Sequence, residues 1–144
     1  MVDVLICKIK YPNDPSGKIV PHQHFVGCYE EGILELYSIS SITGKEYKVY
    51  DKEGMPNPTY YLIIGNERTL CNFKVPSFID CAKSYRLNIT DNMDINKLGH
   101  RGIPKEIVEK IKNKIKETKD NGSHVQYTIS SDDFISHNIK CKIK

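Results

Sequence analysis

The feature that most restricts the fold of this chain is a series of short runs rich in β-branched and other apolar residues, separated by glycine, proline and asparagine. Runs of this kind are typical of β-strands. Two of them are joined by Glu30-Glu31-Gly32, which predicts a hairpin with a glycine-containing turn. The expected strands are residues 2–7, 24–29, 33–40, 47–50, 60–64, 70–73, 77–81, 84–89 and 125–129. Short strands at regular spacing indicate a small barrel or sandwich rather than βαβ units.

A single amphipathic helix is expected from Pro104 to about Lys119, near the C-terminal end of the chain. Proline is favoured at the first position of a helix, and the Asn121-Gly122 pair gives a stop signal. One face carries apolar residues at helical spacing, namely Ile107, Val108, Ile111 and Ile115. Together with the strands, this helix predicts an α+β fold with a small antiparallel sheet.

The length of 144 residues predicts one domain that spans residues 1–144. With 39% hydrophobic and 27% charged residues, the composition is that of a globular protein rather than a disordered one. No apolar run approaches the ~20 residues that cross a bilayer, and no basic segment followed by an apolar signal core stands at the N-terminus. We therefore expect a cytoplasmic protein with no membrane partner.

The chain contains five cysteines, none of them in a CxxC spacing. An odd number without paired spacing argues against both a zinc ribbon and a disulfide framework. We therefore expect reduced cysteines that lie mostly in the core. Neither a metal ion nor an organic cofactor is predicted.

His22 and His24 form the one closely spaced histidine pair, and in a strand both side chains would lie on the same face. A structural or catalytic metal site needs at least a third ligand, and the other histidines are scattered along the sequence. Two interpretations remain. The pair is either a solvated or hydrogen-bonded element of a strand, or it faces a substrate and contacts phosphate or transfers a proton.

Residues 38–45, Ser-Ile-Ser-Ser-Ile-Thr-Gly-Lys, run from a predicted strand into a hydroxyl-rich turn. Hydroxyl groups donate hydrogen bonds to phosphate oxygens, and the positive charge of Lys45 would offset negative charge in a phosphoryl-transfer transition state. The nucleotide-binding signature GxxxxGK[ST] is absent. The alternative is a plain Ser/Thr turn with an exposed lysine.

The polar face of the predicted helix is strongly basic. It carries six lysines and three glutamates, and six minus three gives +3, the net charge of the whole chain. The lysines are Lys105, Lys110, Lys112, Lys114, Lys116 and Lys119. This face is either an ordinary solvated surface or, if it lies next to the Ser/Lys turn, a salt-sensitive binding surface for a polyanion such as RNA.

The order of these elements resembles the PemK/MazF-like toxins, small barrel ribonucleases of bacterial toxin-antitoxin and phage-abortive systems. The matching segments are the strand at 24–28, the Ser/Thr turn at 40–45, the segment at 77–81, and Lys97-Leu98-Gly99 followed by the helix at 104–119. The resemblance covers residues 1–119 in sequence order. It implies a small antiparallel SH3-like β-barrel with one amphipathic C-terminal helix.

The resemblance also implies a metal-independent endoribonuclease that cleaves single-stranded RNA by attack of the 2′-hydroxyl group and leaves a 2′,3′-cyclic phosphate. Sites of this family combine a basic residue after the first loop with the Ser/Thr turn. Carried over to this chain, the predicted catalytic residues are Ser40, Ser41, Lys45 and His24. The predicted RNA-binding residues are His22, Thr43 and Lys18, with Lys105, Lys112 and Lys116 of the helix.

The chain departs from the family where the branch neutralised by a protein has an arginine-proline pair, because Val20-Pro21-His22 stands there. The arrangement of Ser40, Ser41 and Lys45 is more similar to the branch neutralised by a small structured RNA. The expected partners are therefore an RNA substrate and an antitoxin that is a structured RNA or a small protein. The alternatives are a nucleic-acid-binding module that cuts nothing and a protein-interaction domain without salt-sensitive RNA binding.

Overall fold

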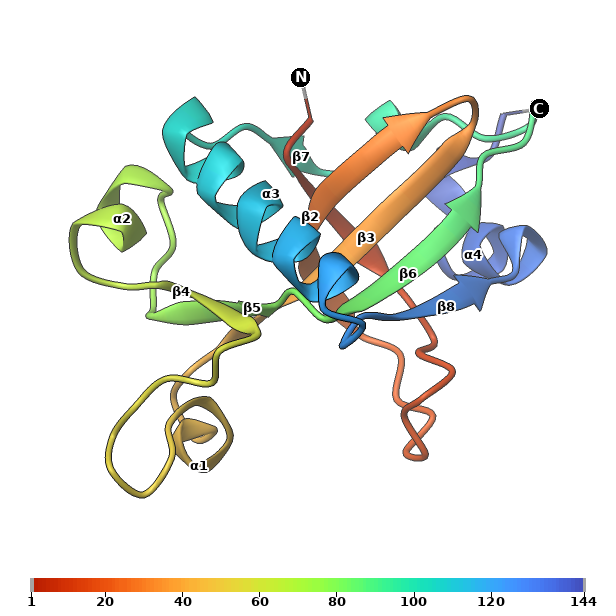
Figure 1. Cartoon of the computed structure of the whole chain (residues 1–144). Helices are drawn as coiled ribbons and strands as arrows, with labels where there is room; N and C mark the ends of the chain where they lie inside the picture. Colours follow the sequence, from red (N-terminus) through yellow and green to blue (C-terminus); the bar gives the residue numbers. More distant parts are fainter. Residues whose placement is uncertain (1, 144) are drawn as a thin grey trace.

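The computed structural model of this chain describes residues 2–143, whose strands form one eight-stranded sheet (Figure 1). The strands are β1 (Val4–Lys8), β2 (Pro21–Glu30), β3 (Ile33–Ser41), β4 (Tyr60–Ile63), β5 (Ser77–Asp80), β6 (Lys83–Asn88), β7 (His100–Arg101) and β8 (Val125–Ile129). Four α-helices accompany them in this part of the chain: α1 (Glu46–Val49), α2 (Gly65–Leu70), α3 (Lys105–Asp120) and α4 (Ser131–His137). Two short 3-10 turns are η1 (Ile95–Lys97) and η2 (Ile139–Cys141).

The sheet is built around β3, whose two halves pair with different strands along one edge. Its first half pairs with β6 and its end pairs with β5, while β2 runs along the other edge. All strand pairs are antiparallel except β6 with β8, which are parallel. The α+β class with a mainly antiparallel sheet is therefore confirmed.

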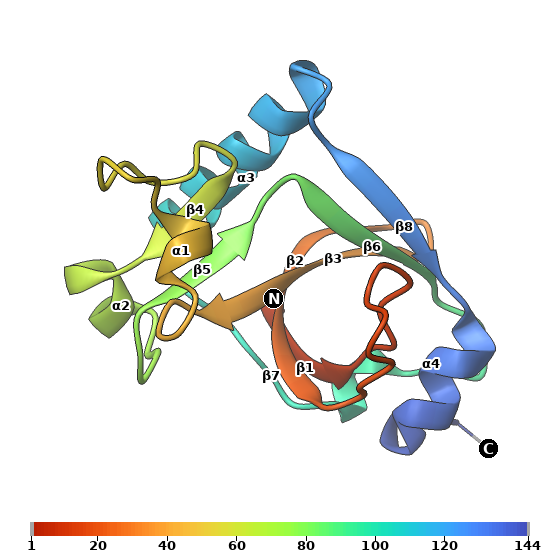
Figure 2. The ribbon, with the colours of Figure 1, turned by 90° about the horizontal axis from the view of Figure 1, so that it is seen from below.

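The sheet curls but does not close into a barrel. The strand order β4-β5-β3-β2-β1-β7, with β6 and β8 branching from β3, leaves β4, β7 and β8 unpaired with one another over residues 2–143. Figure 2 shows β1, β2, β3, β6 and β8 curving around the loop between β1 and β2, here called the β1–β2 loop (residues 9–20). The expected closed barrel is thus replaced by an open, curled sheet.

The two faces of the curled sheet carry separate cores because side chains alternate along each strand. On the inner face, Leu34 and Leu36 of β3 pack with Leu5 of β1. On the outer face, Tyr37 and Ile39 of β3 pack against α3. The residues of α3 in that outer core are Ile107, Ile111 and Ile115, as its apolar spacing predicts.

Two predicted strands are absent, one replaced by a short helix and the other by the end of a helix and a turn. Residues 47–50 belong mostly to α1, in which Val49 is the buried residue. Residues 70–73 fall at the end of α2 and in the turn after it, where Asn72 has a positive φ of 57°. Apolar alternation over four residues fits a single helical turn as well as a strand, so local pattern did not distinguish the two.

The hairpin and the main helix agree closely with expectation. Glu31 and Gly32 both adopt positive φ, 52° and 74°, which is the turn geometry that matches the twist of paired strands. Helix α3 begins at Lys105, with Pro104 as its N-cap residue rather than its first residue, and Asn121 follows its last turn.

All five cysteines are free, and four of them are buried. No helix within residues 2–143 is long and apolar enough to cross a bilayer.

Candidate functional site

A cavity of about 270 Å³ opens on the inner face of the curled sheet, beside the β1–β2 loop. We call it the central pocket. It gathers side chains from the loop and from five segments beyond it, because β2, β3, β5 and β6 all end or begin at this side of the sheet and α1 with its N-cap residue follows β3 there. Polar side chains that line the central pocket include Tyr11, His22, Ser38, Ser40, Lys45, Lys48 and Lys83, with Asp14 and Asp80 at the rim.

Strand alternation explains why the serines of β3 reach this pocket. Ile39 points to the outer face and packs in the core that contains α3. Ser38 and Ser40, on either side of it, therefore point to the inner face and into the central pocket. His24 lies directly opposite Ser38 in the β2–β3 register, so His22 and His24 also face inward.

The charges of the central pocket favour an anion. Its three lysines outnumber its two aspartates, and Lys83 is the one that approaches a carboxylate, with Nζ 3.8 Å from Asp80 Oδ2. Within residues 2–143, neither Lys45 nor Lys48 has a carboxylate oxygen within 4.0 Å. Two lysines without partners at the mouth of a cavity are suited to bind a phosphate group.

His22 is the titratable group of the central pocket that suits proton transfer at neutral pH. Its side chain is partly buried, and burial lowers the pKa of the imidazole below the ordinary value of 6.5. The positive charge of Lys45 lowers that pKa further. His22 is therefore neutral near pH 7 and has a free nitrogen that can accept a proton.

His24 was predicted to be catalytic, but the structure places it beneath the pocket rather than in it. The side chain is fully buried, and burial together with the neighbouring His22 lowers its pKa to about 3. Nδ1 lies 3.1 Å from the backbone oxygen of His22, which can only accept, so Nδ1 carries the proton. Nε2 is then an acceptor, and the hydroxyl group of Tyr11 donates to it over 2.6 Å. His24 thus holds Tyr11 and does not touch a ligand.

Tyr11 belongs to the β1–β2 loop and forms one wall of the central pocket. Its ring lies 4.8 Å from the ring of Tyr85, centroid to centroid, and the Tyr85 hydroxyl group donates to Asn13 Oδ1 over 3.0 Å. Burial raises the pKa of the Tyr11 phenol, with a smaller opposing effect from the Ser38 hydroxyl group. The phenol stays protonated at neutral pH, and these contacts fix the loop against β6 and β2.

Besides His24, three more predicted residues of the loop and the Ser/Thr turn lie outside the central pocket, namely Ser41, Thr43 and Lys18. Ser41 accepts a hydrogen bond from the backbone N–H of Thr43 over 3.2 Å, which makes the ordinary Ser/Thr turn that was the alternative interpretation. Lys18 is exposed at the far end of the β1–β2 loop. Of the predicted catalytic and RNA-binding residues, the central pocket therefore brings together His22, Ser40 and Lys45.

The basic face of α3 does not join the central pocket. Since α3 packs on the outer face of the sheet and the pocket opens on the inner face, the sheet separates them. Lys105 and Lys116 are exposed there, and Lys116 forms an ion pair with Asp120 at 2.7 Å. Of the two interpretations of this face, the one that places the helix lysines next to the Ser/Lys turn does not hold, because the two segments flank opposite faces of the sheet.

Lys112 lines a different and larger cavity of about 590 Å³. That cavity lies beside β2 and η1, and its other charged residues are the acidic Asp3 and Glu30. Two carboxylates against one lysine disfavour a polyanion, whereas the smaller central pocket has the opposite balance. Charge and chemistry therefore point to the central pocket rather than to the larger cavity.

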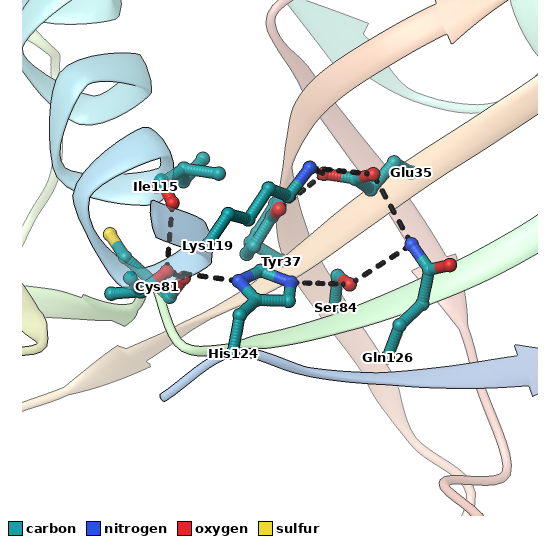
Figure 3. A network of polar contacts seen from close by, with 9 residues as sticks. Glu35, Tyr37, Cys81, Ser84, Ile115, Lys119, His124 and Gln126 are labelled. Carbon is teal, nitrogen blue, oxygen red and sulfur yellow. Dashed lines mark hydrogen bonds and ion pairs between the residues drawn. The ribbon is translucent and has the colours of Figure 1, made fainter. Parts of the chain in front are cut away.

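A second polar cluster joins the end of α3 to the sheet (Figure 3). Thr118 Oγ1 lies within hydrogen-bond distance of the backbone oxygens of Cys81 and Ile115, so it accepts from His124 Nδ1 at 2.9 Å. His124 Nε2 then accepts from Ser84 Oγ at 2.8 Å.

This serine-histidine pair has the contacts of a nucleophile and its base, but Ser84 is completely buried. The cluster is completed by Glu35, which accepts from Lys119 at 2.9 Å and from Gln126 at 3.2 Å. Because no substrate can reach Ser84, the cluster is structural and holds the C-terminal end of α3 to β3, β6 and β8.

Some members of the central pocket were not predicted. Ser38 belongs to the hydroxyl-rich run at 38–45 but was not among the predicted site residues, although it stands two residues before Ser40 in the same strand and so faces the same side. Tyr11, Lys48 and Lys83 had no such signal, because they reach the pocket through the loop, a helix where a strand was expected, and a distant strand. No group of three or more potential metal ligands occurs within residues 2–143.

Neither a scan of protein-family models nor a search of curated proteins found a match to this chain.

Proposed function

We propose that this chain is a metal-independent endoribonuclease that cleaves single-stranded RNA through the 2′-hydroxyl group of the RNA, as the toxin of a toxin-antitoxin or abortive-infection system. The observation that supports this proposal most directly is the placement of His22 beside Lys45 in the central pocket, with Lys48 also free of a carboxylate partner. A neutral imidazole next to unpaired cations is the combination that this reaction needs.

The reaction would proceed without a covalent bond to the protein. His22 accepts the proton of the 2′-hydroxyl group, and the 2′-oxygen attacks the adjacent phosphorus atom. The bond from phosphorus to the 5′-oxygen breaks, which gives a 2′,3′-cyclic phosphate and a 5′-hydroxyl end. The leaving oxygen takes a proton from the ammonium group of Lys45 or Lys48. Exchange with water then returns a proton to the lysine and removes the proton held by His22. The hydroxyl groups of Ser38 and Ser40 donate hydrogen bonds to the phosphate oxygens as charge develops on them.

The resemblance to PemK/MazF-like toxins adds support from the arrangement of elements. The consecutive strands β1, β2 and β3, the long loop after β1, and the helix after Lys97-Leu98-Gly99 follow the order that the family implies. We propose that the open, curled sheet is a variant of the SH3-like barrel of these toxins. The proposed setting is the cytoplasm, with an antitoxin that covers the lysines of the central pocket, for which a structured RNA is the better chemical match.

Purified protein incubated with end-labelled single-stranded RNA tests the proposed activity. We expect fragments that end in a 2′,3′-cyclic phosphate, and we expect His22→Ala to lower the cleavage rate about 100-fold or more, since it removes the general base. His100→Ala serves as the matched control, because His100 is exposed on β7 and lies outside the central pocket. Binding of RNA without fragments would instead identify a non-catalytic binding module. An equal loss of cleavage rate in His22→Ala and His100→Ala would show that His22 is not the general base.

A further inference from the structure

A second cavity adjoins the central pocket on the other side of the β1–β2 loop. It has a volume of about 350 Å³, and we call it the flanking pocket. Tyr11 and Asp14 line both cavities, so this one segment of the loop is the wall between them. The loop lies within the curl of the sheet, with α4 at its outer side (Figure 2). A chain that occupies the central pocket can therefore continue over this wall into the flanking pocket.

The flanking pocket has an apolar floor that is suited to a flat ring. Ile9, Ile129 and Phe134 form this floor, and each has at most 7% of its surface exposed. The walls are held in place by Asn138, whose amide brackets the backbone of Lys8: Oδ1 accepts from Lys8 N–H and Nδ2 donates to the Lys8 oxygen, both over 2.8 Å. Because α4 is fixed against β1 in this way, the pocket is preformed, and a ligand would not need to order its walls.

Two carboxylates line the flanking pocket, and they differ in their partners: Asp14 Oδ1 accepts from the backbone N–H of Ser16 over 2.9 Å, whereas both carboxylate oxygens of Asp133 are free within the described part of the chain. Asp133, in the first turn of α4, lines the cavity and is exposed. Its backbone groups contact Ser130 and Ser136, whereas its carboxylate oxygens have neither a hydrogen bond nor an ion pair among residues 2–143. A carboxylate offers two adjacent acceptors. Among the four RNA bases, guanine alone presents two adjacent donors on its Watson–Crick edge.

We propose that the flanking pocket binds the guanine base of a nucleotide next to the scissile phosphate, with the ring on the apolar floor and the Watson–Crick edge on Asp133. This inference rests on the proposed function, since it makes the two cavities neighbouring subsites for one RNA strand. Single-stranded RNA is read in this way, by ring packing and by hydrogen bonds to base edges. The residues of β8 and α4 that build the pocket lie after residue 119, beyond the segment that carries the family resemblance.

Sequencing the cut ends of a random RNA pool tests this assignment. We expect the wild-type protein to enrich guanine on one side of the cut, and Asp133→Asn to reduce that enrichment about tenfold, because a bidentate contact to the base is lost. Asp132→Asn is the matched control. Asp132 shares the first turn of α4 and its charge but does not line the cavity, so this variant should keep the wild-type preference.

Binding of guanosine 3′-monophosphate, measured by calorimetry, separates the base pocket from the cleavage activity. The wild-type protein should bind this nucleotide about tenfold more tightly than adenosine 3′-monophosphate, and Asp133→Asn should remove the difference. Cleavage without any base preference, or a preference that Asp133→Asn leaves intact, would overturn the base pocket while the proposed function stands. Selective binding of the guanosine nucleotide without RNA cleavage would reject the proposed function and retain the pocket.

Discussion

The Tyr11 hydroxyl group donates to Nε2 of the buried His24 over 2.6 Å, and this contact joins the β1–β2 loop to the inner face of the sheet. The loop forms one wall of the central pocket and the partition to the flanking pocket. A buried hydrogen bond beneath the site therefore controls the shape of the site above it.

Removing the Tyr11 hydroxyl group should destabilise the fold. In Tyr11→Phe the buried Nε2 of His24 loses its donor, and an unsatisfied buried acceptor costs about 1–3 kcal/mol. Urea denaturation of both proteins measures this loss in the free energy of unfolding. Tyr47→Phe makes the same change at a side chain that is 83% exposed and should have no measurable effect. A Tyr11→Phe variant as stable as the wild type would show that the contact is not maintained in solution.

Stability should fall as the pH drops from 6.5 towards 3. The pKa of His24 is about 3 in the fold and near 6.5 in the unfolded chain, so between these values the unfolded state binds the proton and the folded state does not. This one group should make the free energy of unfolding about 2 kcal/mol smaller at pH 5 than at pH 7.5.

Denaturation at the two pH values gives this difference, and His24→Gln should reduce it. His22 and His124 also have lowered pKa values and act in the same direction. A difference between pH 7.5 and pH 5 that is the same in His24→Gln would contradict the assignment to His24.

The proposed role of His22 predicts how the cleavage rate depends on pH. The rate should rise with pH as His22 loses its proton, with a midpoint below 6.5, because burial and Lys45 lower its pKa. Lys45→Ala removes one cause of the lowered pKa, so the midpoint should move to higher pH in addition to any loss of rate. Lys140→Ala, an exposed lysine on η2, should leave the midpoint where it is. An unshifted midpoint in Lys45→Ala would argue that another group acts as the base.

The salt dependence of RNA binding should separate the two basic regions. Each phosphate contact that is lost lowers the slope of log K against log salt by about 0.7 for a single strand. We expect Lys48→Ala to show this change, because Lys48 lines the central pocket. The same substitution at Lys116 on the outer face should leave the slope unchanged, since Lys116 already pairs with Asp120. Fluorescence anisotropy with labelled RNA at several salt concentrations would measure the slopes of both variants. The reverse result would indicate that RNA binds to the lysines of α3.

Local patterns in the sequence predicted the elements that depend on local spacing. Helix α3 follows from the positions of Ile107, Ile111 and Ile115, and the hairpin follows from the glycine after Glu31. The short helix α1 was missed because only Val49 is buried in it, which leaves too little apolar signal to separate a helical turn from a strand.

The candidate site was predictable only in part, because its formation depends on which face each segment presents. Strand alternation puts His22 and His24 on one face, but the sequence does not tell that this face is the inner one. The sequence also does not show that His24 is buried, with Cys7 and Tyr11 in contact with its two ring nitrogens. For the same reason the sequence could not decide whether the α3 lysines lie beside the Ser/Lys turn, from which the whole sheet separates them.

The parallel pairing of β6 with β8 affects how the chain folds during its synthesis. Strand β8 is the last strand within residues 2–143, and all of α3 lies between it and β6. During synthesis, β6 therefore presents a free edge, with unpaired backbone groups, until α3 and then β8 have emerged from the ribosome and β8 has paired with it. Pairing between such distant segments is slow, so this edge is the surface that a chaperone would shield and through which nascent chains would aggregate.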